Sequence, residues 1–386
     1  AMAQPETVWE FRLFKTPEGK NLARSRDIVE DASGGIWVAT WGEGVQYFYK
    51  TEWENYTTED GLPGDWARCI EVDSSGRVWV GTGDGLARKE DSGWVTLVPP
   101  AELSIPLDNI YLLERMKDDV IWVADDLGNL LSYDETAPEP WKIILEEKAT
   151  EGGRIDSVAE VDDGTIWVTL QDKNLFHFDG TKWSHARGAA GDHGLRIGPR
   201  NSRVDNLIAA DTSDLSIYQL VDGEWVSFPA CERKVNSIAN SPTGQLYVGT
   251  NHGVYRYNEG QWDLLDLGRE VGRPEIDGFQ FASDGSLWIG TREGLVRGYL
   301  PSWSSIEGIS KILFRDPDNQ AIIGIDSANG IVVQEGEGWE SVSPLAIPSI
   351  GIVGWTGLFD RKFWILSTSE GSRFEFDLNR ISIDTG

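Results

Sequence analysis

Residues 70–97 read IEVDSSGRVWVGTGDGLARKEDSGWVTL, in which four short apolar segments are separated by residues that favour tight turns. The first segment ends at Val72, and the sequence DSSG that follows supplies side chains that bond the backbone and a glycine that accepts a positive φ. The second segment, Arg77–Thr82, is too apolar to have one solvated face, which is typical of a strand covered on both sides. The stretch therefore predicts four antiparallel strands in succession: 69–72, 77–82, 86–89 and 94–97.

The same pattern recurs along the chain about every 40 residues, and each repeat is expected to end in a strand that begins with tryptophan. The expected fourth-strand tryptophans are Trp53, Trp94, Trp141, Trp183, Trp225, Trp262, Trp303 and Trp339, with Trp9 as a ninth. A unit of four strands with this period is typical of a β-propeller blade. Helical solenoids of similar period would need long apolar patterns of period 3.6, which the sequence lacks.

These features predict an all-β chain that folds as a single β-propeller domain over residues 1–386, with nine four-stranded blades, or eight as the alternative. The blades are expected to run from about residue 27 to residue 386. The strand expected at 7–15 has no partner ahead of it, and the expected last strand near Arg380 lacks a tryptophan. We therefore expect the N-terminal strand to close the ring beside Trp364 and Phe374, with residues 380–384 as the competing strand.

The recurring motif D-x-x-G-x-(I/V/L)-W-(V/I)-(A/G)-T, together with Gly61-Leu62-Pro63 before a new unit, resembles the two-component regulator propeller repeat of bacterial sensory proteins. The motif is clear in the first, second, sixth and seventh units and present in outline elsewhere. The resemblance implies a sensor or ligand-recognition propeller of a bacterial signalling protein, often joined to a kinase or cyclase, although no such output domain is expected within these residues. A sensor input domain would be periplasmic or extracellular, and another role would favour the cytoplasm.

The formal charge of −29, from 63 acidic and 34 basic residues, argues against nucleic acid and bare anionic membrane as partners, because both are polyanionic. No run of 18 apolar residues occurs, so we expect no membrane insertion of this segment. Cys69 and Cys231 lie far apart without zinc-binding spacing and are expected to be free thiols. We expect no cofactor and a monomeric state.

Catalytic and metal-binding patterns are not readable in the sequence. The four histidines are scattered, and no nucleophile stands beside a recognisable base. The Asp-Gly turns offer one or two carboxylates each, fewer than a calcium loop needs, and backbone preference explains them. We therefore expect no enzyme activity, no catalytic residue and no metal. A lyase or glycan-cleaving enzyme is the alternative, and a protein–protein interaction scaffold is a third possibility.

In a propeller, the loops after each second strand and the links between blades gather on one face, here termed the loop face. The candidate ligand-binding residues on these segments are Trp41, Trp66, Asp84, Asp125, His252, Arg292 and Trp355. The three tryptophans have no place in the repeat. They suit an aromatic platform among polar groups, which predicts a carbohydrate or a cationic ligand, with a protein partner as the alternative.

Overall fold

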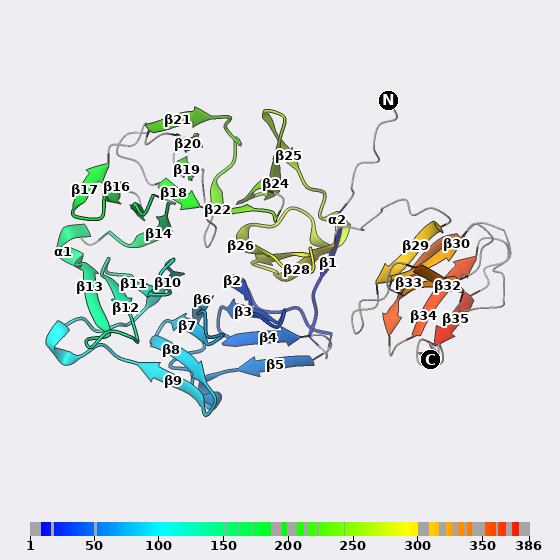
Figure 1. The fold of residues 1–386 in the computed structure, drawn as a ribbon, viewed down its shortest axis with the longest axis horizontal. Helices are drawn as coiled ribbons and strands as arrows, with labels where there is room; N and C mark the ends of the chain where they lie inside the picture. The colour runs from blue at the N-terminus through cyan, green and yellow to red at the C-terminus, as the bar shows by residue number, and fades with distance from the viewer. Residues whose placement is uncertain are drawn as a thin grey trace. The chain divides into compact units, whose positions relative to one another are not determined.

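The structure is a computed structural model that describes residues 9–16, 19–49, 52–150, 153–161, 163–171, 173–186, 195–198, 207–211, 215–221, 224–242 and 244–299, together with seven strands beyond residue 308. The chain divides into two compact units, Ala1–Pro301 and Ser302–Gly386. Each unit consists of antiparallel sheets, and the first forms the ring of sheets seen in Figure 1.

The described part of the first unit contains seven four-stranded sheets arranged as blades around an axis. Blades one to three are β2 (Ser25–Glu30), β3 (Ile36–Thr40), β4 (Val45–Tyr49), β5 (Glu52–Tyr56); β6 (Ala67–Val72), β7 (Val78–Thr82), β8 (Gly85–Glu90), β9 (Gly93–Leu97); and β10 (Ile110–Arg115), β11 (Ile121–Asp125), β12 (Leu130–Tyr133), β13 (Trp141–Leu145). Blades four to six are β14 (Ile155–Glu160), β15 (Ile166–Leu170), β16 (Lys173–Phe178), β17 (Trp183–Ala186); β18 (Leu195–Gly198), β19 (Ile208–Asp211), β20 (Ile217–Val221), β21 (Glu224–Phe228); and β22 (Val235–Asn240), β23 (Leu246–Thr250), β24 (Gly253–Asn258), β25 (Gln261–Leu264). Blade seven joins β26 (Ile276–Phe281), β27 (Leu287–Thr291) and β28 (Gly294–Tyr299) to the N-terminal β1 (Glu10–Leu13).

Short helices lie in the links between blades: the 3₁₀ turns Thr58–Asp60 and Ala101–Leu103, α1 (Glu147–Thr150) and α2 (Gly268–Val271). The second unit contains one four-stranded and one three-stranded sheet. Its strands are β29 (Ile309–Arg315), β30 (Ile322–Asp326), β31 (Ile331–Glu335), β32 (Gly338–Ser341), β33 (Ile352–Phe359), β34 (Lys362–Ser367) and β35 (Arg373–Asp377).

The prediction of a β-propeller with four-stranded blades is confirmed, but the predicted count of nine blades, and the alternative of eight, are wrong. The ring has seven blades, and the repeats predicted as the eighth and ninth blades form the two sheets of the second unit. Sequence periodicity identifies each four-stranded repeat, but the number that closes a ring depends on the angle between neighbouring sheets. That angle arises from side-chain packing, which the period does not encode.

The N-terminal strand closes the ring, as predicted, but it joins a different blade. Strand β1 pairs antiparallel with β28, with Glu10 opposite Tyr299 and Leu13 opposite Val296. The predicted partner, the sheet that contains Trp364 and Phe374, lies in the second unit. Trp303, which was predicted to end the seventh blade, and the expected strand near Arg380 lie outside the described residues. Blade seven has three consecutive strands, β26 to β28, and β1 supplies the fourth beside β28.

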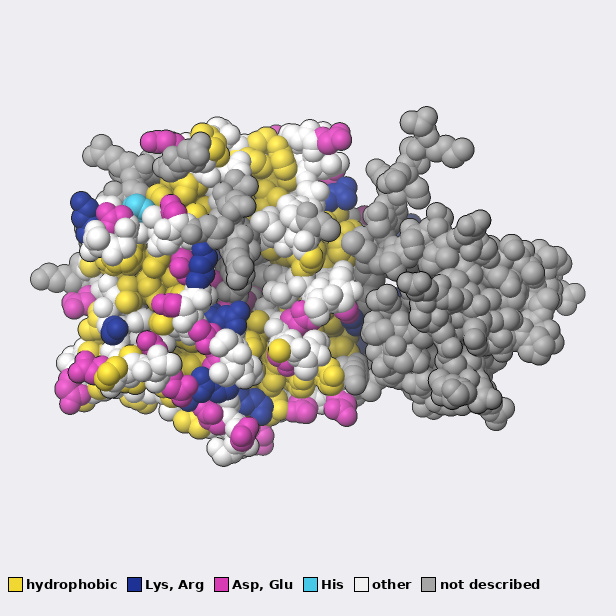
Figure 2. Space-filling view, viewed as in Figure 1, with side chains coloured by type: hydrophobic (Ala, Val, Ile, Leu, Met, Phe, Trp, Pro, Cys, Tyr) yellow, Lys and Arg dark blue, Asp and Glu magenta, His cyan; other side chains and the backbone are white. Residues whose placement is uncertain are grey.

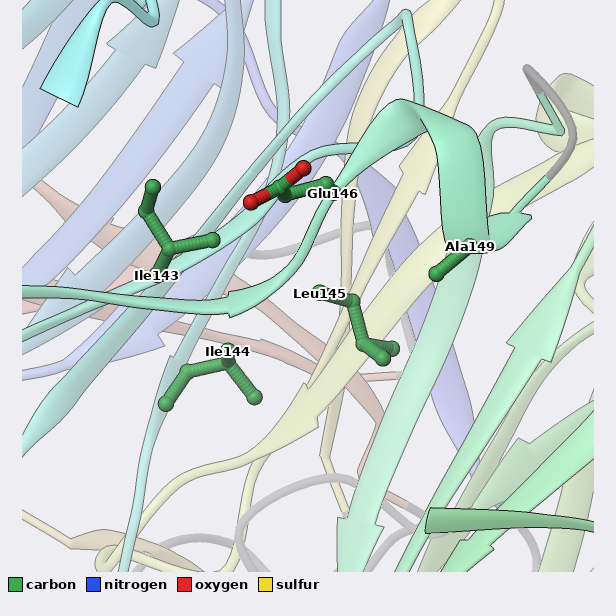
Figure 3. A pocket seen from close by; sticks show the side chains of 5 residues that line it. All are labelled: Ile143, Ile144, Leu145, Glu146 and Ala149. Carbon is green, nitrogen blue, oxygen red and sulfur yellow. The ribbon is translucent and has the colours of Figure 1, made fainter.

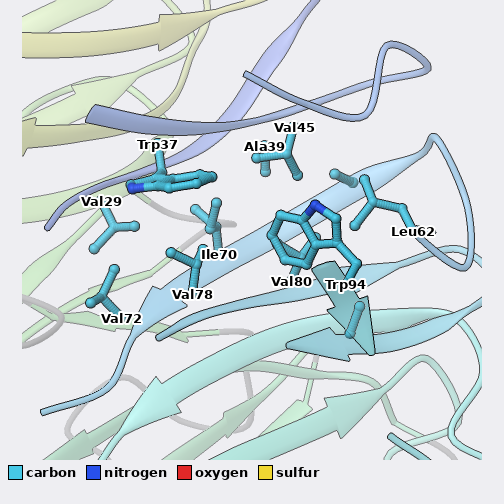
Figure 4. Packing of buried hydrophobic residues seen from close by; sticks show 12 residues of the cluster. Val29, Trp37, Ala39, Val45, Leu62, Ile70, Val72, Val78, Val80 and Trp94 are labelled. Atoms are coloured by element: carbon cyan, nitrogen blue, oxygen red, sulfur yellow. The ribbon is translucent and has the colours of Figure 1, made fainter. Parts of the chain in front are cut away.

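The hydrophobic core lies between adjacent blades. In the cluster of Figure 4, side chains from β2, β3 and β4 of blade one meet side chains from β6, β7 and β9 of blade two. Trp37 packs against Trp94 there, with ring centres 6.3 Å apart. Tryptophan suits these broad sheet-to-sheet contacts because one ring covers a large apolar area.

The aspartate of the repeated Asp-Gly turn also accepts a hydrogen bond from the indole N–H of the buried tryptophan in the next strand. Asp73 accepts hydrogen bonds from the backbone N–H groups of Ser75 and Arg77, and its second oxygen accepts one from Trp79 Nε1 at 3.0 Å. Asp31 bonds its own turn and Trp37 Nε1 in the same way. The turn aspartates are therefore structural, as predicted.

These hydrogen bonds predict acid sensitivity of the first two blades. Although burial raises the pKa of Asp73, the bonds from Trp79 and Arg77 outweigh it and hold the pKa below its ordinary value. The stabilisation is therefore complete above the pKa of the unfolded chain, about 3.9, and is lost as the pH falls through the lower folded-state pKa. We expect Asp73→Asn to lower the free energy of unfolding at neutral pH by about 1–3 kcal/mol and to flatten its decline below pH 5. Urea unfolding at several pH values tests this; Asp91→Asn, an exposed turn residue, is the control. If the free energy of unfolding of Asp73→Asn falls as steeply below pH 5 as that of the parent, this prediction is contradicted.

Candidate functional site

The innermost strand of most blades carries a β-bulge at its second residue. The register of the first strand pair shifts at this point in six blades. The residues inside these shifts are Arg26, Arg68, Tyr111, Asp156, Asn236 and Asp277. Because a bulge re-aims a side chain, the inner strands place a polar or aromatic group at matching positions around the ring axis.

The bulge residues and their neighbours form a continuous series of contacts across blades one to four. The guanidinium carbons of Arg24, Arg26 and Arg68 lie 5.9, 5.3 and 5.5 Å from the centre of the Trp41 ring. Arg68 also lies 4.3 Å from the Tyr111 ring centre, and Arg154 lies 4.4 Å from the same ring. These distances are within the range of cation–π attraction. We call Arg24, Arg26, Trp41, Arg68, Tyr111 and Arg154 the arginine–aromatic cluster.

Two of the arginines in the cluster have carboxylate partners. Arg24 donates two hydrogen bonds to Asp277, of 2.5 and 2.6 Å, which join blade one to blade seven. This bond is the main reason that the pKa of Arg24 is raised. Arg154 pairs with Asp156 at 2.8 Å, and Arg196 of blade five reaches the other oxygen of that carboxylate at 3.3 Å. These pairs join the inner ends of blades one and seven, and of blades four and five.

Arg26 and Arg68 differ, because no carboxylate of the described residues forms an ion pair with either. Burial lowers the pKa of Arg26; Asp277 opposes this, and the charges of Arg24 and Arg68 add to it. In Arg68, Nε and Nη1 are buried and have no hydrogen-bond partner in the described part of the chain. Among the described residues, the cluster thus contains two arginines without a direct ion pair, in a protein with a net charge of −29.

The structure brings together two of the three predicted tryptophans. Trp41, at the end of β3, and Trp66, before β6, form an isolated antiparallel bridge, and their rings meet edge to face at 4.8 Å. Trp66 is 48% exposed, whereas Trp41 is half-buried beneath the guanidinium groups. Figure 2 shows Lys and Arg side chains near the middle of the first unit's ring, with Asp and Glu side chains among them.

Of the other predicted ligand-binding residues, Asp84 lies in the loop after β7 and Asp125 is the last residue of β11. Asp84 is exposed, and its backbone N–H donates to Thr82 Oγ1. Asp125 is 1% exposed, and its oxygens accept three hydrogen bonds from Leu127 and Asn129 of its own loop. Burial raises the pKa of Asp125. In this structure its side chain shapes a loop.

Of the remaining predicted residues, His252 and Arg292 belong to the first unit and Trp355 to the second. His252 Nε2 is 3.3 Å from Arg273 Nη1, and Arg292 pairs with Glu275 at 2.9 Å. Glu275 also acts electrostatically on Arg24, so Arg292 borders the cluster through this residue. Trp355 belongs to β33 of the second unit, and its side chain lies outside the described residues.

Hollows elsewhere on the described surface do not coincide with these residues. One is lined by Ile143, Ile144, Leu145, Glu146 and Ala149, at the outer strand of blade three and the start of α1 (Figure 3). Another lies beside Pro229, Cys231 and Trp262 between blades five and six. The first is lined mainly by apolar side chains, with Glu146 at its edge, and the lining of the second also includes Glu232 and Arg233.

Within the described residues, no group of three or more His, Cys, Asp or Glu side chains is arranged to hold a metal ion. Cys69 and Cys231 are both buried, and neither forms a disulfide bond, as predicted. None of the described helices has the length and apolar character needed to cross a membrane.

Five residues of the cluster were not predicted from the sequence: Arg24, Arg26, Arg68, Tyr111 and Arg154. Aligning the repeats on their first strands would have placed Arg26, Arg68, Tyr111, Asp156, Arg196, Asn236 and Asp277 in one column. Polar and aromatic residues in the innermost strand, where apolar ones are expected, were the available signal.

Comparison with known proteins supports the sequence-based resemblance. Residues 61–84 match the model of the two component regulator propeller family, which confirms the predicted resemblance at that repeat. No curated protein matches the chain in sequence.

Solved structures with similar folds have different biological roles. The extracellular domain of a protein described as a hybrid two component system from B. thetaiotaomicron is 15% identical, with a TM-score of 0.62; the match covers 96% of this chain and 54% of that one. The present chain thus spans about half of that domain. Virginiamycin B lyase from Staphylococcus aureus is 15% identical, with a TM-score of 0.59 and coverage of 75% and 100%. YCF48 from Cyanidioschyzon merolae is 13% identical, with a TM-score of 0.57 and coverage of 76% and 100%. These likenesses show the fold alone.

Proposed function

We propose that this chain is a non-catalytic sensor propeller that recognises a small ligand on its loop face, as the input domain of a bacterial signalling protein. The observation that carries the proposal is the arginine–aromatic cluster beside the exposed Trp66, where loops and inner strands of several blades converge. The match of residues 61–84 and the fold shared with a two-component extracellular domain favour the same role. The proposal includes a periplasmic or extracellular location, a monomeric state, and no nucleic-acid, membrane or cofactor partner.

Tryptophan fluorescence tests the location of the ligand site. In a screen of neutral and charged small molecules, we expect a bound ligand to change the emission, because Trp41 and Trp66 lie at the proposed site. Trp66→Ala should weaken binding at least about tenfold, the loss expected for one stacking contact. Trp262→Phe, on the outer strand β25, is the control and should bind like the parent. Unchanged affinity in both Trp41→Ala and Trp66→Ala would contradict the proposed site.

A propeller enzyme is the second candidate, favoured by the shared fold with virginiamycin B lyase. Turnover of a panel of polysaccharides, lactones or esters that is abolished by His252→Ala or Glu293→Gln would establish it over the sensor role. An interaction scaffold is less favoured, because the exposed large apolar residues of the described surface are spread over several blades, from Trp66 and Val95 to Val226.

A further inference from the structure

The charge of the arginine–aromatic cluster is opposite to that of the protein as a whole. Four guanidinium groups surround Trp41 and Tyr111, and the two carboxylates that pair with the cluster, Asp277 and Asp156, are already engaged with Arg24 and with Arg154 and Arg196. A cationic ligand, one of the classes predicted from the tryptophans, would meet like charges here. The electrostatic environment of the cluster favours an anion.

Arg68 carries an unmet hydrogen-bonding requirement. Its Nε and Nη1 are buried without a partner among the described residues, and a buried charged donor left unpaired is strongly unfavourable. The rings of Trp41 and Tyr111 hold this guanidinium in place by cation–π contact, but they accept no strong hydrogen bond from it. An acceptor with negative charge would satisfy the group.

Arg26 lies close enough to act together with Arg68. Both guanidinium carbons are within 5.5 Å of the centre of the same Trp41 ring, and each comes from a bulge of an adjacent blade. Guanidinium groups match the oxygen geometry of carboxylate and phosphate, so two of them beside one ring can both contact one oxyanion. Trp66, exposed and in contact with Trp41, offers an apolar surface for the rest of a ligand.

We propose that the arginine–aromatic cluster binds the oxyanion, a carboxylate or a phosphate, of a small organic ligand, with Arg26 and Arg68 as its direct contacts. This rests on the proposed ligand-recognition function and specifies the chemistry of the ligand. Arg24 and Arg154, each with its own carboxylate, position the two aromatic rings from either side.

The experiment uses the full chain and three probes at matched ionic strength: inorganic phosphate, benzoate and the neutral benzyl alcohol. Binding is measured by tryptophan fluorescence and by the rise in melting temperature, since a ligand that binds only the folded state stabilises it. We expect a saturable response to phosphate or benzoate in the millimolar range and none to benzyl alcohol. A stronger response to benzoate identifies a carboxylate on an apolar group, and a stronger response to phosphate identifies a phosphate.

Arg68→Met should weaken the anion response at least about tenfold, the usual loss for one charged hydrogen bond. Arg26→Met provides a second variant that does not depend on the folding of the first. Arg115→Met, an exposed arginine at the last residue of β10 and outside the cluster, is the control and should respond like the parent. The absence of a saturable response to both anions, or a response unchanged in both variants, would overturn the inference. A neutral ligand whose binding depends on Trp66 but not on Arg68 would overturn it too, while leaving the proposed function intact.

Discussion

Deleting residues 1–16 is expected to lower the melting temperature of the ring severely or to prevent its folding. The deletion removes β1, the fourth strand of blade seven, and exposes the edge of β28. It also removes Trp9, which is 8% exposed in the core between blades six and seven, and Phe14, whose ring lies 4.7 Å from Phe48 of blade one. Both the last blade and its contact with the first would be lost.

Trp9→Ala separates side-chain packing from the backbone pairing of β1. Truncation of a large buried aromatic typically costs about 3–5 kcal/mol, and we expect a loss in that range. Urea unfolding followed by near-ultraviolet circular dichroism measures it. The matched control is a chain ending at residue 301, which retains all seven blades and should melt like the ring of the parent. If the deletion of 1–16 melts like the parent and the chain ending at 301 does not, the closing strand has been assigned to the wrong end.

Trp79→Ala is expected to cost about 3–5 kcal/mol of unfolding free energy, because it empties a large volume between blades two and three. The ring is 1% exposed, packs with Tyr133 at 5.3 Å, and donates its N–H to Asp73. The substitution therefore also leaves a buried carboxylate oxygen with one donor fewer.

Trp66→Ala is the matched control for Trp79→Ala, since Trp66 is 48% exposed and surface substitutions usually change stability by less than about 0.5 kcal/mol. Both variants are compared with the parent by urea unfolding. Similar losses in the two variants would contradict the view that the second-strand tryptophans hold adjacent blades together. Combining Trp79→Ala with Asp73→Ala should cost less than the sum of the two changes, because they remove the same hydrogen bond.

The four strands of blade two could be predicted because their turns have local causes. A strand too apolar for one wet face and an Asp-x-x-Gly turn both depend on neighbouring residues, and β6 to β9 follow the prediction closely. Closure of the ring is a non-local property. The sequence contains eight repeats with a terminal tryptophan. It does not show that the strand after Trp9, rather than one at Trp303, forms the fourth strand of blade seven.

The candidate site likewise contains residues that the sequence could identify and residues that depend on the fold. Trp41 and Trp66 could be identified because they break the repeat, and the structure places their rings in contact. Arg26 and Arg68 follow the repeat in sequence position and depart from it only through a bulge, which shifts the register by one residue. A shift of that kind turns a side chain that would face a neighbouring sheet toward the axis.

The pairing of β1 with β28 also determines how the ring would respond to mechanical load. Glu10 lies opposite Tyr299, so the chain enters β1 and leaves β28 at the same end of the strand pair. Tension between the segment before residue 9 and the segment after residue 299 would peel the two strands apart one hydrogen-bonded pair at a time, rather than shear all pairs at once. Peeling needs less force than shearing because few bonds carry the load at any moment. A pull along the chain would therefore open the ring at this seam first, with the other six blades still folded.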